Sequence, residues 1–244
     1  MSRYEVYETL QKYGITCGNG ITVFSELDEI YRLCRFFELG QLVSFEKPDA
    51  YIKIDNEILI IEHFSVDGYK SYPNGGSKLQ RNKSEQQAIF DNLQLNEDWA
   101  SHIADIGVLS SYKDFISNCI SAFDHHYEKI PSYKKHLIDE DIADENTQFT
   151  ICFLIDDISP MGTFVTDGEK IIPICLGKSE EFLSFFEAKE NVDWVVSAVT
   201  APEGYTPYFF SRKEINTCKN NIIDYSACQF LTGNYTQIAV KTVV

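Results

Sequence analysis

The sequence predicts a single α/β domain with a central mixed sheet flanked by helices. Apolar residues recur at helical spacing in several segments, which predicts amphipathic helices. Between these segments stand short apolar runs bounded by turn residues, which predict strands, and some of them follow one another closely enough to form hairpins. The 244 residues are 44% hydrophobic and 14% aromatic. A composition of this kind excludes a disordered chain and supports a sizeable core.

The amino-terminal third is expected to hold two helices and three strands. An amphipathic helix over residues 4–14 is followed by Ser25, which is placed to cap a helix over 26–39 that ends before Gly40. Strands are expected at 42–45, 50–54 and 58–64. The run at 58–61 is apolar on both of its faces, as in a strand that is covered on both sides.

The rest of the chain alternates helices and strands less regularly. A loop over 66–77 precedes a helix at 78–93, and further helices are expected at 112–129 and from Pro131 onward. An acidic connection over 139–145 leads to a strand at 149–155. A hairpin over 162–175 turns at Asp167-Gly168. A helix at 179–189, a strand at 194–199, a helix near 211–225 and a strand near 236–243 complete the prediction.

Several features predict a cytoplasmic protein. The apolar runs are too short to cross a bilayer, and the amino terminus has no apolar signal core. The seven cysteines are scattered, and none forms a Cys-x-x-Cys pair, so neither a zinc ribbon nor a dithiol redox site is indicated. Buried free thiols in a reducing compartment are the expected state.

The net charge of −16, from 37 acidic and 21 basic residues, argues against broad affinity for nucleic acid. Residues 68–84 are an exception, because they contain basic residues and no acidic one. This strip is either a surface that faces phosphate groups or a solvated loop and helix start. Its basic residues are Lys70, Lys78, Arg81 and Lys83.

Two acidic residues are expected to meet on one face of the second hairpin. If the chain turns on a two-residue loop at Asp55-Asn56, Asp49 lies directly opposite Glu62. Two carboxylates so close repel each other unless a cation compensates them, and oxygen ligands favour Mg²⁺ or Mn²⁺. A three-residue loop would instead pair Asp49 with His63 and turn the acids onto opposite faces.

Pro48-Asp49 entering one strand and Glu62-His63-Phe64 ending the next resemble the PD-(D/E)xK, or restriction-endonuclease-like, nuclease superfamily. The resemblance implies an αβββαβ core over about 25–156, with a helical insertion at 67–148 and a carboxy-terminal extension at 157–244. It implies that paired acids hold Mg²⁺ for phosphodiester hydrolysis in DNA or another nucleic acid. The implied metal ligands are Asp49, Glu62, the backbone carbonyl of His63, and Glu26 or Glu29. Gln86 followed by Phe90 resembles the Gln-x-x-x-Tyr helix of one branch.

The sequence departs from the motif at its lysine, which falls on Phe64. Phenylalanine can neither orient nor activate the attacking water. A migrated lysine at Lys53, Lys70 or Lys78 would restore that role, with Lys53 on the same strand face as Asp49. His63 is less suited, since adjacent strand residues point to opposite faces. Without a substitute, the site would bind metal or nucleic acid and leave it uncleaved.

Other interpretations of these residues are open. Asp49 can cap a turn after Pro48, and Glu62 can pair with a nearby Lys or Arg side chain. The His125-His126 pair is expected on an exposed helix, because adjacent histidines on a helix point apart. One rival function is a non-catalytic acidic protein that binds a basic protein partner, and another is a phosphate-ligand enzyme that uses the glycine loop at 74–78.

Overall fold

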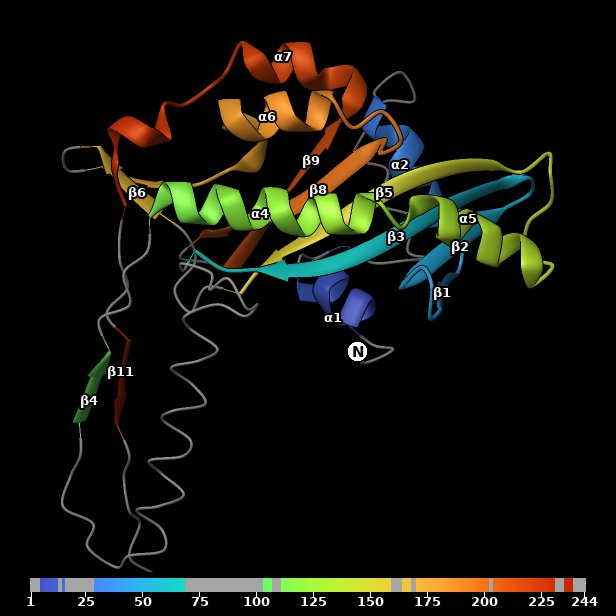
Figure 1. Ribbon diagram of the computed structural model, residues 1–244, viewed down its shortest axis with the longest axis horizontal. Helices are drawn as coiled ribbons and strands as arrows, with labels where there is room; N and C mark the ends of the chain where they lie inside the picture. Colours follow the sequence, from blue (N-terminus) through green and yellow to red (C-terminus); the bar gives the residue numbers. More distant parts are fainter. Residues whose placement is uncertain are drawn as a thin grey trace, which may run out of the picture.

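The computed structural model describes residues 5–12, 15, 29–68, 103–106, 111–158, 164–167, 170–201, 204–230 and 235–238. Its centre is a six-stranded mixed sheet in the order β1-β2-β3-β5-β8-β9 (Figure 1). Strands β3, β5 and β8 run parallel to one another, and the remaining neighbours are antiparallel. The strands are β1 (Leu42–Ser44), β2 (Ala50–Ile54), β3 (Glu57–Val66), β5 (Gln148–Asp157), β8 (Trp194–Ala201) and β9 (Gly204–Ser211).

The hairpin of β2 and β3 turns on two residues. Ile54 pairs with Glu57, and Asp55 adopts a φ of 51°, the left-handed conformation that such a tight turn needs. Aspartate and asparagine tolerate this conformation better than other non-glycine residues do. The predicted two-residue loop is confirmed, and the three-residue alternative is wrong.

Helices cover both faces of the sheet. One face carries α4 (Tyr112–Tyr127), α5 (Ile130–Asp139), α6 (Glu180–Glu187) and α7 (Ile215–Lys219), whose buried side chains join one hydrophobic cluster. The opposite face carries α1 (Glu5–Lys12) and α2 (Glu29–Leu39), which pack into a second cluster. Strand β3 contributes alternate residues to the two clusters: Ile58 and Ile60 to the first, Leu59 and Ile61 to the second. The fold class predicted from the sequence is therefore confirmed.

Serine side chains define where two of the covering helices begin. Ser111 Oγ accepts the Asp114 amide at the start of α4, and Ser179 Oγ accepts the Phe182 amide at the start of α6. Each satisfies an amide that has no partner inside the helix. The two serines therefore fix the residues at which α4 and α6 begin.

Two smaller sheets complete the described chain. Strands β6 (Phe164–Asp167) and β7 (Lys170–Pro173) form the predicted hairpin, and β10 (Gln229–Phe230) pairs with β6. Strand β11 (Tyr235–Ile238) pairs with β4 (Ile103–Ile106), away from the six-stranded sheet (Figure 1). None of the described helices has the length and apolarity that crossing a bilayer requires.

Four elements differ from the sequence prediction. Strands β4, β9 and β10 were not expected, and the helix expected near 211–225 is instead α7 with short 3₁₀ turns at Arg212–Glu214 and Tyr225–Ala227. Proline at position 207 argues against a central strand, but β9 is the last strand of its sheet, where proline is tolerated. The predicted loop at 69–77 and helix at 78–93 lie outside the described residues, as does the start of the helix predicted from 26.

The close approach of α2 to β2 requires glycine at position 40. A Cβ atom there would lie 2.1 Å from Ile52 Cγ2 and 2.9 Å from the Phe36 carbonyl oxygen. We expect Gly40→Ala to lower the free energy of unfolding by about 1–3 kcal/mol, the usual cost of overpacking. Gly177→Ala is the milder control, since its Cβ would meet nothing closer than 3.2 Å. Urea unfolding measures both, and equal stabilities of the two variants would contradict the interpretation.

Candidate active site

Asp49 and Glu62 meet where β2 begins. The pairing of Ala50 with Ile61 places the two acids opposite each other. The Asp49 amide donates to Glu62 Oε2 at 3.4 Å, and the His63 amide donates to Asp49 Oδ2 at 2.9 Å. Each acid therefore contacts the backbone of the opposite strand. The observed register of the hairpin is therefore the one that brings the two acids together.

Two side chains from the covering helices hold the Glu62 carboxylate. Glu62 is only 4% exposed. Its Oε1 accepts the Tyr133 hydroxyl at 2.5 Å and lies 2.6 Å from His126 Nδ1. Burial, the hydrogen bond to Glu62 and the charges of Glu62 and Asp49 raise the pKa of Tyr133 well above its ordinary value. Tyr133 therefore remains a donor throughout the physiological pH range.

His126 lies over the position that the motif lysine would occupy. Its ring stacks on Phe64, with ring centroids 4.8 Å apart and an angle of 15° between the planes. Because a carboxylate only accepts hydrogen bonds, Nδ1 is the nitrogen that donates to Glu62, and Nε2 of the neutral ring is an acceptor. An imidazole oriented in this way by a carboxylate is the arrangement of a general base.

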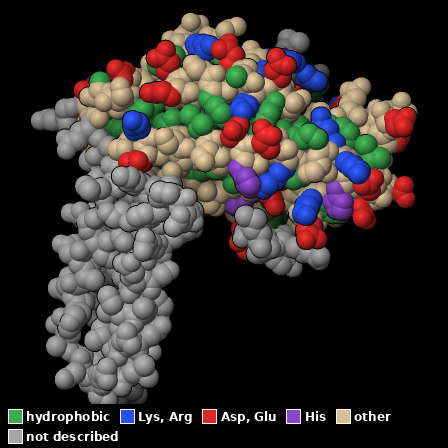
Figure 2. Space-filling view, in the orientation of Figure 1, with side chains coloured by type: hydrophobic (Ala, Val, Ile, Leu, Met, Phe, Trp, Pro, Cys, Tyr) green, Lys and Arg blue, Asp and Glu red, His purple; other side chains and the backbone are tan. Residues whose placement is uncertain are grey.

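The exposure predicted for the histidine pair is wrong for His126. The His126 side chain is 11% exposed, whereas His125 faces solvent. The two rings do not point apart as predicted: they meet edge to face, with ring centroids 5.5 Å apart and an angle of 86° between the planes. Figure 2 shows histidine side chains on the surface that α4 and α5 form.

Sequence reasoning missed His126 and Tyr133 because each meets Glu62 across a long chain separation, 64 and 71 residues respectively. A local signal was nevertheless present. His126 follows Cys119 and Phe123 at helical spacing on the buried face of α4, and Tyr133 lies between Ile130 and Leu137 on the buried face of α5. Polar residues on an apolar helix face indicate a buried partner.

His63 takes no part in this arrangement through its side chain. As expected for a neighbour of Glu62 on a strand, it points to the other face, where Nε2 lies 3.1 Å from Thr9 Oγ1 of α1. On the same α1 helix, Lys12 pairs with Asp156 at 2.7 Å.

Lys53 does not reach the two acids. It is exposed near the hairpin turn, and its ammonium group donates to the Ile142 carbonyl at 2.6 Å. Glu29 begins α2, but its side chain is outside the described set. The other predicted site residues lie outside the described ranges altogether: Glu26, Lys70, Lys78, Arg81, Lys83, Gln86 and Phe90.

The two carboxylates fit Mg²⁺ by their chemistry. This ion takes oxygen ligands, and it is commonly held by one or two carboxylates, water and the phosphates of a substrate. Within the part of the chain that the structure describes, no group of three or more His, Cys, Asp or Glu side chains is arranged to hold a metal. Magnesium or manganese at Asp49 and Glu62 therefore stays a prediction.

Comparison with known proteins does not assign a family. No family model matches the sequence, and neither curated proteins nor solved structures give a match.

The hydrogen bond from Tyr133 to Glu62 is open to a direct stability test. We expect Tyr133→Phe to lower the free energy of unfolding by about 1.5–3 kcal/mol, because it removes a donor from a buried carboxylate. Tyr127→Phe is the matched control: its hydroxyl accepts only an exposed bond from Asn191, so its effect should stay below about 0.5 kcal/mol. Denaturant unfolding at neutral pH measures both, and a Tyr133→Phe effect as small as the control's would show that Glu62 does not need this donor.

Proposed function

We propose that this protein is a nuclease-like phosphodiesterase in which Asp49 and Glu62 are the paired acids and His126 takes the role of the missing motif lysine. The observation that carries the proposal is the contact of Glu62 Oε1 with His126 Nδ1, 2.6 Å long, beside Asp49 and above Phe64. Paired acids with an oriented imidazole are chemically suited to the hydrolysis of a phosphodiester.

The order of elements supports the family resemblance. Between residues 29 and 157 the chain runs α2-β1-β2-β3, then α4 and β5, with β4 and α5 as additions. This is the αβββαβ order that the PD-(D/E)xK resemblance implies. Asp49 immediately precedes β2, and Glu62 lies opposite it on β3, which is the placement that the resemblance implies for the paired acids.

In the proposed mechanism, His126 Nε2 accepts a proton from the attacking water. Glu62 fixes the ring through Nδ1 and stabilises the imidazolium that forms. Tyr133 holds the Glu62 carboxylate in place through its hydroxyl. Phe64 supports the ring face, so that the imidazole cannot rotate freely. The water oxygen forms a bond to phosphorus as the ester bond to the leaving oxygen breaks, and the leaving oxygen takes its proton from solvent. Tyr133, Glu62 and Phe64 position the His126 ring, which takes up the proton of the water.

Asp49 and Glu62 would hold Mg²⁺ or Mn²⁺, which when bound would polarise the scissile phosphate and lower the pKa of the attacking water. Lys70, Lys78, Arg81 and Lys83 would contact the nucleic-acid backbone. On a chain with a net charge of −16, this strip supplies the local positive charge that phosphate binding needs.

A specific observation favours one alternative. Glu62 already has two protein donors, Tyr133 and His126, which can compensate its charge without a metal. A centre of this kind could be purely structural. The protein would then be a non-catalytic partner that binds a basic protein through its acidic surface.

Metal binding distinguishes these two functions. We expect Mg²⁺ or Mn²⁺ to raise the melting temperature of the protein saturably, because a ligand that binds only the folded state stabilises it. Asp49→Asn and Glu62→Gln should abolish the increase, whereas Asp139→Asn, an exposed acid at the end of α5, should keep it. Differential scanning fluorimetry with and without a chelator measures the effect. A wild-type protein that gives no increase would favour the non-catalytic alternative.

Cleavage assays test the role of His126. We expect His126→Gln to lower the rate of cleavage of single- or double-stranded DNA or RNA by about 10²–10⁴-fold, the usual contribution of a general base. His125→Gln is the matched control, because it changes the exposed neighbour, and it should cleave at the wild-type rate. Loss of the acidic limb of the pH–rate profile in His126→Gln, where protonation of a general base lowers the rate, would separate loss of the base from a loss of folding. Cleavage by His126→Gln at the wild-type rate would refute the proposed role.

A further inference from the structure

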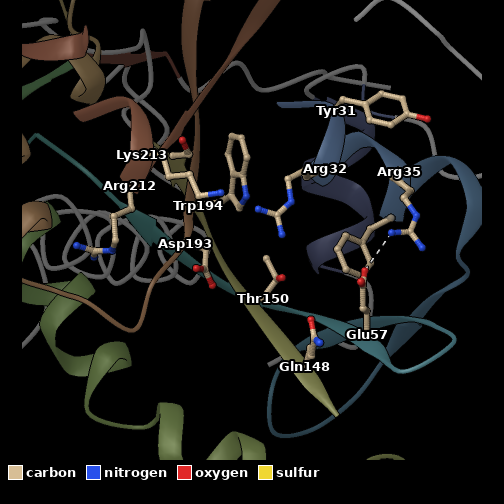
Figure 3. Close-up of a pocket in the computed structure, with 12 residues that line it drawn as sticks. Tyr31, Arg32, Arg35, Glu57, Gln148, Thr150, Asp193, Trp194, Arg212 and Lys213 are labelled. Carbon is tan, nitrogen blue, oxygen red and sulfur yellow. Dashed lines mark hydrogen bonds and ion pairs between the residues drawn. The ribbon is translucent and has the colours of Figure 1, made fainter. Parts of the chain in front are cut away.

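A cavity of about 260 Å³ lies on the α2 face of the sheet. Its wall is α2, and its floor is formed where β3, β5 and β8 begin and where β9 ends (Figure 3). Glu62, by contrast, faces α4 and α5 on the opposite side of the sheet. The cavity is therefore separate from the candidate active site, and nothing proposed above uses it.

The lining of this cavity reverses the charge balance of the chain. Four of its residues are basic and two are acidic, which gives 4 − 2 = +2 in a protein whose net charge is −16. A concave surface with one excess sign of charge concentrates ligands of the opposite sign. The charged residues are Arg32, Arg35, Arg212, Lys213, Glu57 and Asp193.

Cationic neighbours balance both acids. Arg35 pairs with Glu57 at 3.1 Å (Figure 3). Asp193 accepts the Ile151 amide at 2.8 Å, and the charges of Lys134, Arg212 and Arg32 all attract its carboxylate. An anion that enters the cavity would therefore meet a surface whose acids are compensated, and it would interact chiefly with the basic side chains.

Arg32 is the basic residue best placed to bind such an anion. In Figure 3 its guanidinium reaches into the space between Trp194 and Thr150, whereas Arg212 points away from that space. Arg212 instead donates to the carbonyl groups of Phe186, in the last turn of α6, and of Val192, beyond the end of that helix. Thr150 adds a hydroxyl group to the lining, and Trp194 adds an indole ring.

We propose that this cavity binds a small phosphate-bearing molecule, with the Arg32 guanidinium taking the phosphate and the surface around Trp194 and Thr150 contacting the rest. A guanidinium presents paired N–H donors that match phosphate oxygens, which gives both charge and geometry. The volume is slightly below the usual range for drug-sized ligands, about 300–1,000 Å³, so the ligand is small.

The fluorescence of Trp194 provides the test. The chain has two tryptophans, and Trp99→Phe leaves Trp194 as the only reporter. We expect inorganic phosphate or adenosine monophosphate to change its emission saturably at constant ionic strength, whereas chloride should not. Arg32→Gln, made in the same background, should weaken binding at least about tenfold, the loss expected for a charge-assisted hydrogen bond.

Two further variants keep the test decisive. Lys213→Gln removes a second positive charge from the lining and should weaken binding by a smaller factor. Lys219→Gln changes an exposed lysine on α7 that pairs with Glu187, and it should bind as tightly as the parent. Unchanged far-UV circular dichroism would show that each variant is folded.

Three outcomes would overturn the proposal: no saturable response to either probe, an equal response in Arg32→Gln and the parent, or binding of a single-stranded oligonucleotide without binding of phosphate and adenosine monophosphate. The last outcome would assign the cavity to a polymer instead. None of these results bears on cleavage by His126, so the two proposals fail independently.

Discussion

The burial of the Glu62 carboxylate is the constraint on which the arrangement of this protein's α4–α5 side depends. A charge removed from water costs several kcal/mol unless donors compensate it. Glu62 is 4% exposed, and its donors come from two separate helices, His126 on α4 and Tyr133 on α5. Docking of both helices on the sheet therefore supplies the donors that the buried Glu62 carboxylate needs.

The same carboxylate is set within an apolar layer. On β3 its neighbours on the same face are Ile60 and Phe64, and both belong to the cluster that α4 to α7 cover. A low-dielectric surrounding strengthens hydrogen bonds to a charged group and increases the cost of leaving any of them unmade. The hydrophobic core and the polar contacts of Glu62 therefore depend on each other. The core makes those contacts strong, and the contacts fix where α4 and α5 lie.

The sequence predicted what depends on local chemistry and failed where distant segments meet. Asp55-Asn56 indicated the two-residue turn, and strand periodicity then placed Asp49 opposite Glu62. Strand β9 was missed because Pro207 argues against a strand unless the strand is known to lie at the end of a sheet. The partners of Glu62 were missed for a different reason: the polar residues on the apolar faces of α4 and α5 indicate a buried partner, but they do not identify one that lies 64 or 71 residues away.

In the proposed nuclease-like site, Phe64 and His126 act as a pair. A lysine at position 64 would share the strand face of Glu62 and bring an ammonium group to it. Phenylalanine brings no charge, but it offers a flat apolar surface, and the His126 ring lies parallel to that surface at 4.8 Å. In the proposed function the imidazole takes the place of that lysine, because it donates to Glu62 through Nδ1 and can accept a proton at Nε2. In that proposal, the Phe64 ring stands at the position of the motif lysine and supports the imidazole that would replace it.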